Sequence, residues 1–189
     1  MSLTSAITPE LGTRSPDFRL PDTQGNDVSL NDFDRYKGLL VIFMCNHCPY
    51  VKHIREALAA FARRNEPRSL AVVGINANDA STHPADSLEK MVEEVQTVGY
   101  TFPYLHDETQ EVAKAYRALC TPDFFLYDEN RRLAYRGQFD DSRPGNNVEV
   151  TGKDIQSAVD SLLDGRDVPH DQKPSVGCNI KWKPGNEPH

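Results

Sequence analysis

Apolar residues occur along this chain in two patterns, continuous runs and helical spacing. Continuous runs at 38–44, 70–75 and 124–127 suit strands whose two faces are both buried. After Pro49 and after Pro84, apolar residues recur at three- and four-residue intervals, which predicts amphipathic helices. The alternation of buried strands with helices predicts an α/β fold in which helices cover both faces of one sheet.

Shorter patterns predict the elements around this sheet. Alternating polar and apolar residues on both sides of a Gly-containing turn predict an N-terminal β-hairpin over 17–30. A short helix is expected at 111–119, and 124–136 is typical of a second hairpin. Thr151, with Asp154 three residues later, is typical of a helix N-cap and predicts that the last helix opens there.

Length and composition fit one domain with a C-terminal extension. A chain of 189 residues can bury a sizeable core. We expect residues 12–167 to form one domain. Residues 168–189 are rich in Pro, Gly and Lys, which is typical of an extended tail, and we expect this tail to pack on the domain. Trp182, the only tryptophan, is expected to anchor the tail by burying apolar surface.

The charge and the apolar runs argue against some classes of partner. The net charge is −7, and basic residues cluster in nothing longer than pairs such as Arg63 and Arg64, so no nucleic-acid surface is expected. No apolar run approaches the ~20 residues that cross a bilayer. Residues 1–18 show no signal-peptide pattern. We therefore expect a cytoplasmic protein that binds neither nucleic acid nor membrane.

The clearest chemical motif is a Cys-x-x-Cys formed by Cys45 and Cys48, between the apolar run 38–44 and the helix expected from Pro49. At a helix start, unsatisfied N–H groups and the positive end of the helix dipole favour a thiolate. A thiolate is the nucleophile of disulfide exchange, and four cysteines are too few for a disulfide scaffold. The motif predicts a pair that cycles between dithiol and disulfide, with Cys45 as the attacking thiol and Cys48 as the resolving thiol.

Several stretches together carry a family resemblance. They are Ser-Pro-Asp-Phe-Arg-Leu-Pro-Asp at 15–22, Cys-Asn-His-Cys-Pro-Tyr-Val at 45–51, Thr-Pro-Asp-Phe-Phe-Leu at 121–126, 137–144, and Gly-Cys-Asn-Ile-Lys-Trp-Lys at 177–183. The chain resembles the thioredoxin superfamily, in its peroxiredoxin-like AhpC/TSA branch, over roughly 12–183. The resemblance implies a thioredoxin-like fold, in which helices flank a central mixed β-sheet, with an N-terminal β-hairpin and an extended C-terminal tail.

The same resemblance implies a function and roles for two further residues. The activity would be that of a thiol–disulfide oxidoreductase without cofactor or metal, acting on a disulfide- or thiol-bearing protein or small molecule and re-reduced by a partner. Pro122 would follow a cis peptide bond and lie against the redox pair. His47 would place positive charge beside the Cys45 thiolate, as in oxidising relatives with Cys-Pro-His-Cys, and make the pair more oxidising. Cys45 would be the more exposed of the two cysteines.

The other two cysteines leave several arrangements open. Cys120 directly precedes Thr121 and Pro122, so the resemblance implies that it lies close to the Cys45–Cys48 pair. If the tail folds over this site, Cys178 is able to pair with Cys120 as a second disulfide, structural or relay. Alternatively, Cys120 packs beside the first pair, or the two thiols are unrelated. Sequence does not fix the pairing of four cysteines.

Two other functions compete with disulfide exchange. A thiol peroxidase of this family would carry Pro-x-x-x-Thr-x-x-Cys, but counting back from Cys45 gives Ile42 and Gly38 at those positions. Slow peroxide reduction through the dithiol stays open. A metal-binding module would hold zinc through four tetrahedral ligands. Three of them would be Cys45, Cys48 and Cys120, and the fourth would be Cys178 or His47.

Overall fold

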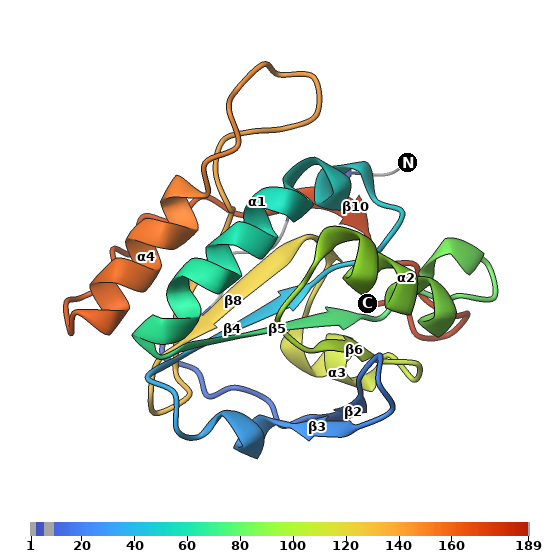
Figure 1. The fold of residues 1–189 in the computed structure, drawn as a ribbon, viewed down its shortest axis with the longest axis horizontal. Helices are drawn as coiled ribbons and strands as arrows, with labels where there is room; N and C mark the ends of the chain where they lie inside the picture. Colours follow the sequence, from blue (N-terminus) through green and yellow to red (C-terminus); the bar gives the residue numbers. More distant parts are fainter. Residues whose placement is uncertain (1–2, 6–9, 189) are drawn as a thin grey trace.

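The structure is a computed structural model that describes residues 3–5 and 10–188 of the chain. Within this part, a five-stranded sheet forms the centre of the fold (Figure 1). Its strands are β4 (Gly38–Phe43), β5 (Leu70–Asn76), β6 (Tyr104–His106), β8 (Asp123–Tyr127) and β9 (Leu133–Gly137). They lie in the order β6-β5-β4-β8-β9, parallel from β6 to β4 and antiparallel from β4 to β9. The predicted central mixed sheet is confirmed.

Strand β4 divides the core into two layers because successive side chains of a strand point to opposite faces. Leu40 and Ile42 belong to one buried cluster, and Leu39, Val41 and Phe43 belong to the other. All six β4 residues are buried. The continuous apolar run therefore has the burial that the sequence predicts.

Helices cover both faces of the sheet, as expected (Figure 1). The helices are α1 (Pro49–Asn65), α2 (Leu88–Val98), α3 (Glu111–Tyr116) and α4 (Lys153–Leu163), with 3₁₀ turns η1 (Leu30–Phe33), η2 (Glu66–Arg68) and η3 (Pro84–Asp86). Side chains of α1, α2 and α4 fill the cluster on the Leu40 face. Side chains of α3 and of the N-terminal region fill the other cluster. The N-terminal hairpin is confirmed as β2 (Arg19–Pro21) paired antiparallel with β3 (Asp27–Ser29).

Helix α1 forms where the sequence predicts it. Pro49 occupies a first-turn position, where its missing N–H costs nothing. Val51, Ile54 and Leu58 recur at helical spacing and are buried against the sheet. The helix thereby holds its first residues next to the carboxyl end of β4.

Two details of the helices differ from the predictions. The last helix opens at Gly152, with φ 66°, rather than at Thr151. The carboxylate of Asp140 accepts hydrogen bonds from the backbone N–H groups of Thr151 and Gly152, both at 2.7 Å, so a distant side chain replaces the local cap. Leu88, expected on the buried face of α2, is 40% exposed because it lies in the first turn.

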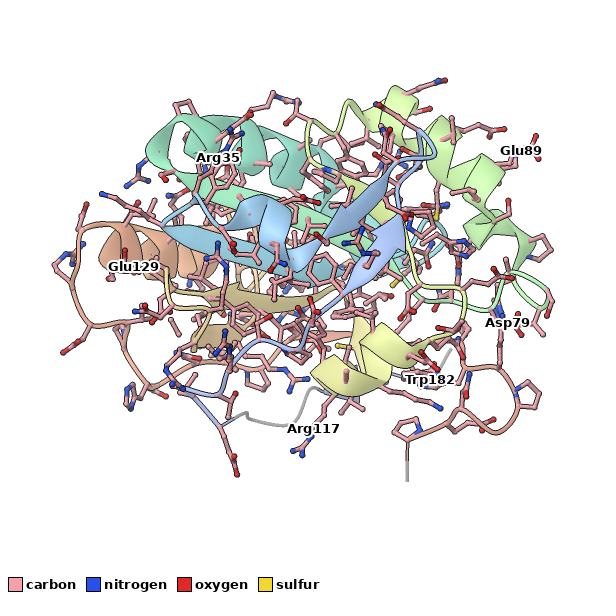
Figure 2. The ribbon with its side chains drawn as sticks, turned by 90° about the horizontal axis from the view of Figure 1, so that it is seen from below. Arg35, Asp79, Glu89, Arg117, Glu129 and Trp182 are labelled. Atoms are coloured by element: carbon pink, nitrogen blue, oxygen red, sulfur yellow. The ribbon has the colours of Figure 1, made fainter. Side chains whose placement is uncertain are left out.

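The C-terminal tail packs on the rest of the described chain. Its strand β10 (Val176–Asn179) lies antiparallel between β1 (Leu3–Ser5) and β7 (Cys120–Thr121), beside the start of α1 in Figure 1. Trp182 is partly buried on the cluster that contains α3, and it lies beside that helix in Figure 2. No helix of the described residues combines the length and apolarity needed to cross a membrane.

Candidate functional site

The Cys-x-x-Cys motif forms the link between β4 and α1. Cys48 is the N-cap of α1, with extended backbone angles of φ −66° and ψ 125°, and Cys45 lies three residues earlier. Cys45 is 1% exposed and Cys48 is 0% exposed, so the expected greater exposure of Cys45 is not found. The cysteine at the helix start is Cys48, because the helix begins only at Pro49.

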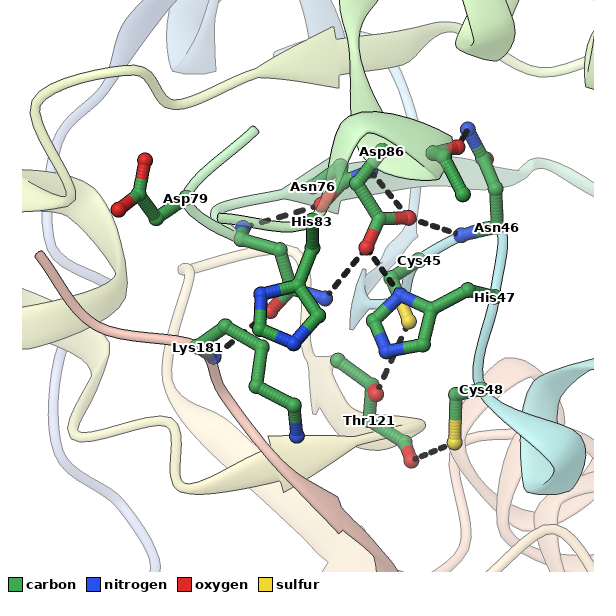
Figure 3. Close-up of polar contacts among 12 residues, drawn as sticks. Cys45, Asn46, His47, Cys48, Asn76, Asp79, His83, Asp86, Thr121 and Lys181 are labelled. Atoms are coloured by element: carbon green, nitrogen blue, oxygen red, sulfur yellow. Dashed lines mark hydrogen bonds and ion pairs between the residues drawn. The ribbon is translucent and has the colours of Figure 1, made fainter. Parts of the chain in front are cut away.

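Thr121 contacts both sulfurs of the motif (Figure 3). Its Oγ1 lies 3.3 Å from Cys45 Sγ, and its carbonyl oxygen accepts a hydrogen bond from Cys48 Sγ at 3.2 Å. The peptide bond between Thr121 and Pro122 is cis, which confirms that expectation. The sequence-predicted residues Cys45, Cys48 and Pro122 therefore meet at one site.

Asp86, on the 3₁₀ turn η3, is a member of the site that sequence reasoning missed. Its side chain is 0% exposed and contacts His47 Nδ1. It also accepts hydrogen bonds from the backbone N–H of Asn46 at 2.7 Å and from the side-chain amide of Asn78 at 2.9 Å. Although burial raises its pKa, the hydrogen bonds from His47, Asn78 and Asn46 hold the pKa of Asp86 below its ordinary value.

One sequence signal pointed toward this region. An Asn- and Asp-containing loop follows β5, the strand parallel to β4, and the carboxyl ends of parallel strands collect functional groups. Asn76, the last residue of β5, and Asn78 of that loop lie within hydrogen-bond distance of Asp86, at 3.5 and 2.9 Å. The spacing of 38 residues between Cys48 and Asp86 gives no local pattern, so only the fold joins them.

His47 faces Asp86 in this site rather than standing alone beside Cys45. Its ring also stacks on His83, with centroids 5.1 Å apart and planes at 21°. Burial lowers the pKa of His83, and the nearby His47 and Lys181 add to the effect. Any positive charge on His47 is therefore balanced by the carboxylate of Asp86. The predicted influence of His47 on the Cys45 thiolate stays a prediction.

The two thiols of the motif have opposite electrostatic environments. Burial raises the pKa of Cys45 well above its ordinary value, and the hydrogen bond with Cys48 and the negative charge of Asp86 raise it further. The hydrogen bond from Cys45 lowers the pKa of Cys48 to about 4, against the effect of burial, with further donors in the Cys178 thiol and the Val51 N–H. The Thr121 carbonyl acts in the opposite sense because it accepts from the thiol form of Cys48. Four hydrogen bonds, the fourth from the Cys178 N–H, lower the pKa of Cys48, so ionisation is favoured at Cys48 over Cys45. The role of Cys45 as the attacking thiol stays a prediction.

The remaining cysteines lie on two neighbouring strands. In the antiparallel register, Cys178 lies opposite Thr121 and Asn179 lies opposite Cys120. Because successive residues alternate in direction, Cys178 and Cys120 point to opposite faces of this ladder. Cys178 packs in the same core cluster as Cys45 and Cys48, whereas Cys120 Sγ lies 3.7 Å from the carbonyl oxygen of Pro122. The structure brings Cys178 to the Cys45–Cys48 pair and does not place it opposite Cys120.

The ligand set for a metal also differs from the sequence hypothesis. Cys45, His47 and Asp86 each offer one ligand atom, and these atoms lie within 4.8 Å of one another. A structural zinc site uses four ligands. The carboxylate of Asp86 is already engaged by His47, Asn46 and Asn78. These contacts fit an Asp86 carboxylate that accepts hydrogen bonds better than one that ligates a metal.

A surface pocket lies next to Pro122. It is lined by residues that include Tyr50 of α1, Pro122, Phe139, Arg143 and Val176. The lining is mainly apolar, with one guanidinium group held by backbone oxygens of Asp140 and Ser142 at 2.6 and 2.7 Å. This small depression adjoins the cis peptide bond between Thr121 and Pro122.

The chain matches one protein-family model and several solved structures. The model of the AhpC/TSA family matches residues 11–136. A hypothetical protein from Sinorhizobium meliloti 1021 is 55% identical, with a TM-score of 0.95 over 96% of this chain and 100% of that one. A putative thiol:disulfide interchange protein DsbE from Chlorobium tepidum is 20% identical, with a TM-score of 0.65 over 82% of this chain and 98% of that one, and shows the fold alone.

Two curated relatives carry functional names. The thiol-disulfide oxidoreductase ResA of Geobacillus kaustophilus (strain HTA426) is 28% identical over 120 residues, which is 64% of this chain and 64% of that protein. The match therefore spans less than two thirds of ResA. A putative peroxiredoxin of Mycobacterium tuberculosis is 31% identical over 122 residues, 62% of this chain and 69% of that protein. Both relatives are oxidoreductases by name, and both matches are distant.

Proposed function

Because the chain belongs to the AhpC/TSA family and has the thioredoxin-like fold, we propose that it is a thiol–disulfide oxidoreductase in which Cys45 and Cys48 cycle between dithiol and disulfide. The contact of one residue, Thr121, with both sulfurs carries this proposal. Two thiols held against the same residue are close enough to exchange hydrogen bonds with each other. One of the two thiols has a lowered pKa and the other a raised pKa, so the pair offers both a thiolate to attack and a thiol to donate a proton.

The chemistry follows from this arrangement. One protein thiolate attacks a substrate disulfide, so that a mixed disulfide forms and one substrate sulfur leaves as a thiolate. The second cysteine then attacks the protein sulfur of the mixed disulfide, which forms the Cys45–Cys48 bond and releases the second substrate thiol. Two electrons pass to the substrate. With Cys48 as the thiolate and Cys45 as the thiol, one of the two protons that the substrate sulfurs take up comes from Cys45 and the other from solvent.

The substrate class follows from the chemistry of the site. We expect a disulfide- or thiol-bearing protein segment or small molecule to approach over the surface around Pro122, where apolar side chains and Arg143 surround a small depression. A separate dithiol donor must return the Cys45–Cys48 disulfide to the reduced state if the protein acts as a reductant. If it acts as an oxidant, its electrons pass to an acceptor disulfide instead.

A redox titration tests the proposed function. The purified protein is equilibrated in glutathione and dithiothreitol buffers, alkylated, and mapped at every cysteine by mass spectrometry. We expect one reversible two-electron transition at Cys45 and Cys48, lost in Cys45→Ser and in Cys48→Ser and kept in the matched variant Cys120→Ser. A midpoint near ~−270 mV would indicate a reductant, and one near ~−120 mV an oxidant. No transition at this pair would refute the proposal.

A thiol peroxidase is a second candidate because of the Thr121 hydroxyl. That hydroxyl lies at the sulfur of Cys45, where the local sequence offers only Ile42 in the position expected for a threonine. If the proton of Cys45 passes to Cys48, peroxide would oxidise the Cys45 thiolate to a sulfenic acid with release of water or alcohol, and the Cys48 thiol would then form the disulfide and release water.

Thr121→Val distinguishes this candidate. We expect the variant to lose peroxide-driven formation of the Cys45–Cys48 disulfide while it still exchanges with oxidised glutathione. The measurement is the rate of peroxide consumption with dithiothreitol as donor. Equal rates of peroxide consumption in the variant and the unchanged protein would show that the Thr121 hydroxyl has no role in peroxide reduction, and the peroxidase candidate would fail.

A further inference from the structure

The C-terminal strand β10 brings a third thiol to the redox pair. Cys178 lies opposite Thr121 in the antiparallel ladder, and side chains directly opposite in such a ladder have Cβ atoms about 4.5–5.5 Å apart. Thr121 is the residue that contacts the sulfurs of both Cys45 and Cys48. Cys178 is 1% exposed and belongs to the same buried cluster as those two cysteines.

The backbone around Cys178 is fitted closely to the site. A Cβ atom at Gly177 would lie 2.1 Å from the carbonyl oxygen of Thr121 and 3.2 Å from the nitrogen of Pro122. Only a residue without a side chain lets β10 approach β7 this closely. On its other edge, β10 pairs with β1, which places Cys178 opposite Leu3. The strand is therefore held from both sides with Cys178 directed at the pair.

Cys178 lies close enough to Cys48 for the two thiols to change one another's pKa. Hydrogen bonding between their side chains contributes to the lowered pKa of Cys48. Burial, followed by this contact, raises the pKa of Cys178 to about 12. Cys48 thus has two sulfur neighbours, Cys45 and Cys178, which donate to it in the same way.

We propose that Cys178 is a second resolving thiol, which competes with Cys45 for the sulfur of Cys48. In the oxidised protein, Cys178 loses its proton and its sulfur attacks Cys48 Sγ. The Cys48–Cys178 bond forms, the Cys45–Cys48 bond breaks, and Cys45 leaves as a thiolate that takes up the proton. One disulfide exists before and after, so the step needs no oxidant or reductant. The proposal rests on the proposed disulfide cycle of Cys45 and Cys48.

The step moves the disulfide from one side of the site to the other. Before it, Cys45 is bonded and the strand β10 carries a thiol. After it, the disulfide ties α1 to the C-terminal strand, and Cys45 is again a thiol beside Asp86 and Thr121. The protein would therefore have two oxidised forms with different sulfurs available to a partner.

Disulfide mapping of Cys45→Ser tests the third thiol. The full-length variant is oxidised with diamide, quenched with acid, alkylated with N-ethylmaleimide and digested without reduction. We expect a Cys48–Cys178 disulfide, retained in Cys45→Ser/Cys120→Ser and lost in Cys45→Ser/Cys178→Ser. A Cys48–Cys120 disulfide, or no intramolecular disulfide in Cys45→Ser, would overturn the proposal.

The unchanged protein separates this proposal from the proposed function. If it forms no Cys45–Cys48 disulfide, the disulfide cycle itself fails. If it forms that disulfide but Cys45→Ser forms none with Cys178, only the third thiol fails. Should Cys45→Ser not fold, the oxidised parent is mapped beside Cys178→Ser and the matched control Cys120→Ser. We expect the parent and Cys120→Ser to contain both the Cys45–Cys48 and the Cys48–Cys178 disulfides, and Cys178→Ser to contain Cys45–Cys48 alone. No Cys48–Cys178 disulfide in the parent would contradict the proposal.

Discussion

Replacing Arg136 with methionine is expected to reduce the free energy of unfolding by about 3–5 kcal/mol, because it leaves a buried carboxylate without its partner. The Arg136 guanidinium donates to Asp123 Oδ2 at 3.1 Å, and their side chains are 5% and 0% exposed. Burial raises the pKa of Asp123, and Arg136 acts against that rise. Methionine keeps much of the side-chain volume over Phe125, on whose ring the guanidinium lies 4.4 Å from the centroid.

Denaturant unfolding at neutral pH measures this effect. The matched control is Arg166→Met, which breaks an ion pair with Asp164 whose side chains are 61% and 56% exposed, and should change stability by less than about 1 kcal/mol. Adding Asp123→Asn to Arg136→Met should restore much of the loss, since no buried charge remains. If the double variant is as unstable as the single one, the unpaired charge is not the cause. Asp123 directly follows Pro122, so this ion pair also fixes the strand that carries the site.

The stability of the reduced protein should depend on pH through the thiol of Cys48. In the folded protein its pKa is about 4, and the ordinary value is 9.0. Between these values the unfolded chain binds more protons at this group, so stability rises with pH and is lost as the pH falls toward 4. Above 9 the raised pKa of Cys45 acts in the opposite sense, since the unfolded thiol ionises first.

Unfolding in denaturant between pH 4 and 9, with a reductant present, checks this dependence. Carboxylates such as Asp86 also lose stabilising contacts in acid, so the informative quantity is the difference between the unchanged protein and Cys48→Ser. That difference should grow with pH across the window. In Cys45→Ala, the ultraviolet absorbance of the thiolate should titrate at a higher pH, because the main hydrogen-bond donor to Cys48 is gone. A difference that does not vary with pH would show that Cys48 is not the thiolate.

The elements of the fold follow closely from local sequence pattern. The run 38–44 is fully apolar, and every residue of β4 is buried; the spacing after Pro49 gives the buried face of α1. Both features depend on residues a few positions apart, whose period differs between strand and helix. The start of α4 was predicted wrongly for the opposite reason. Its cap comes from Asp140, which is too distant to form a local motif with Gly152.

The candidate site divides in the same way. The motif of Cys45 and Cys48, and the dipeptide Thr121-Pro122, are visible in the sequence because each is local and the family resemblance relates them. The exact start of the helix and the donors around each sulfur are not local properties, so the sequence does not record them. The structure makes Cys48 the N-cap and surrounds it with Cys45, Cys178 and the Val51 N–H.

By itself, the sequence determined the strands and helices, the family and the pair of thiols, since each is encoded by neighbouring residues or by a short motif. Only the tertiary structure decided that Asp86 reaches His47 and that β10 brings Cys178 to Cys48. It also decided that Cys120 and Cys178 point to opposite faces, because the register of two strands far apart in the sequence is set by packing. Contacts between segments this distant depend on the closure of the whole core, and no local period records them.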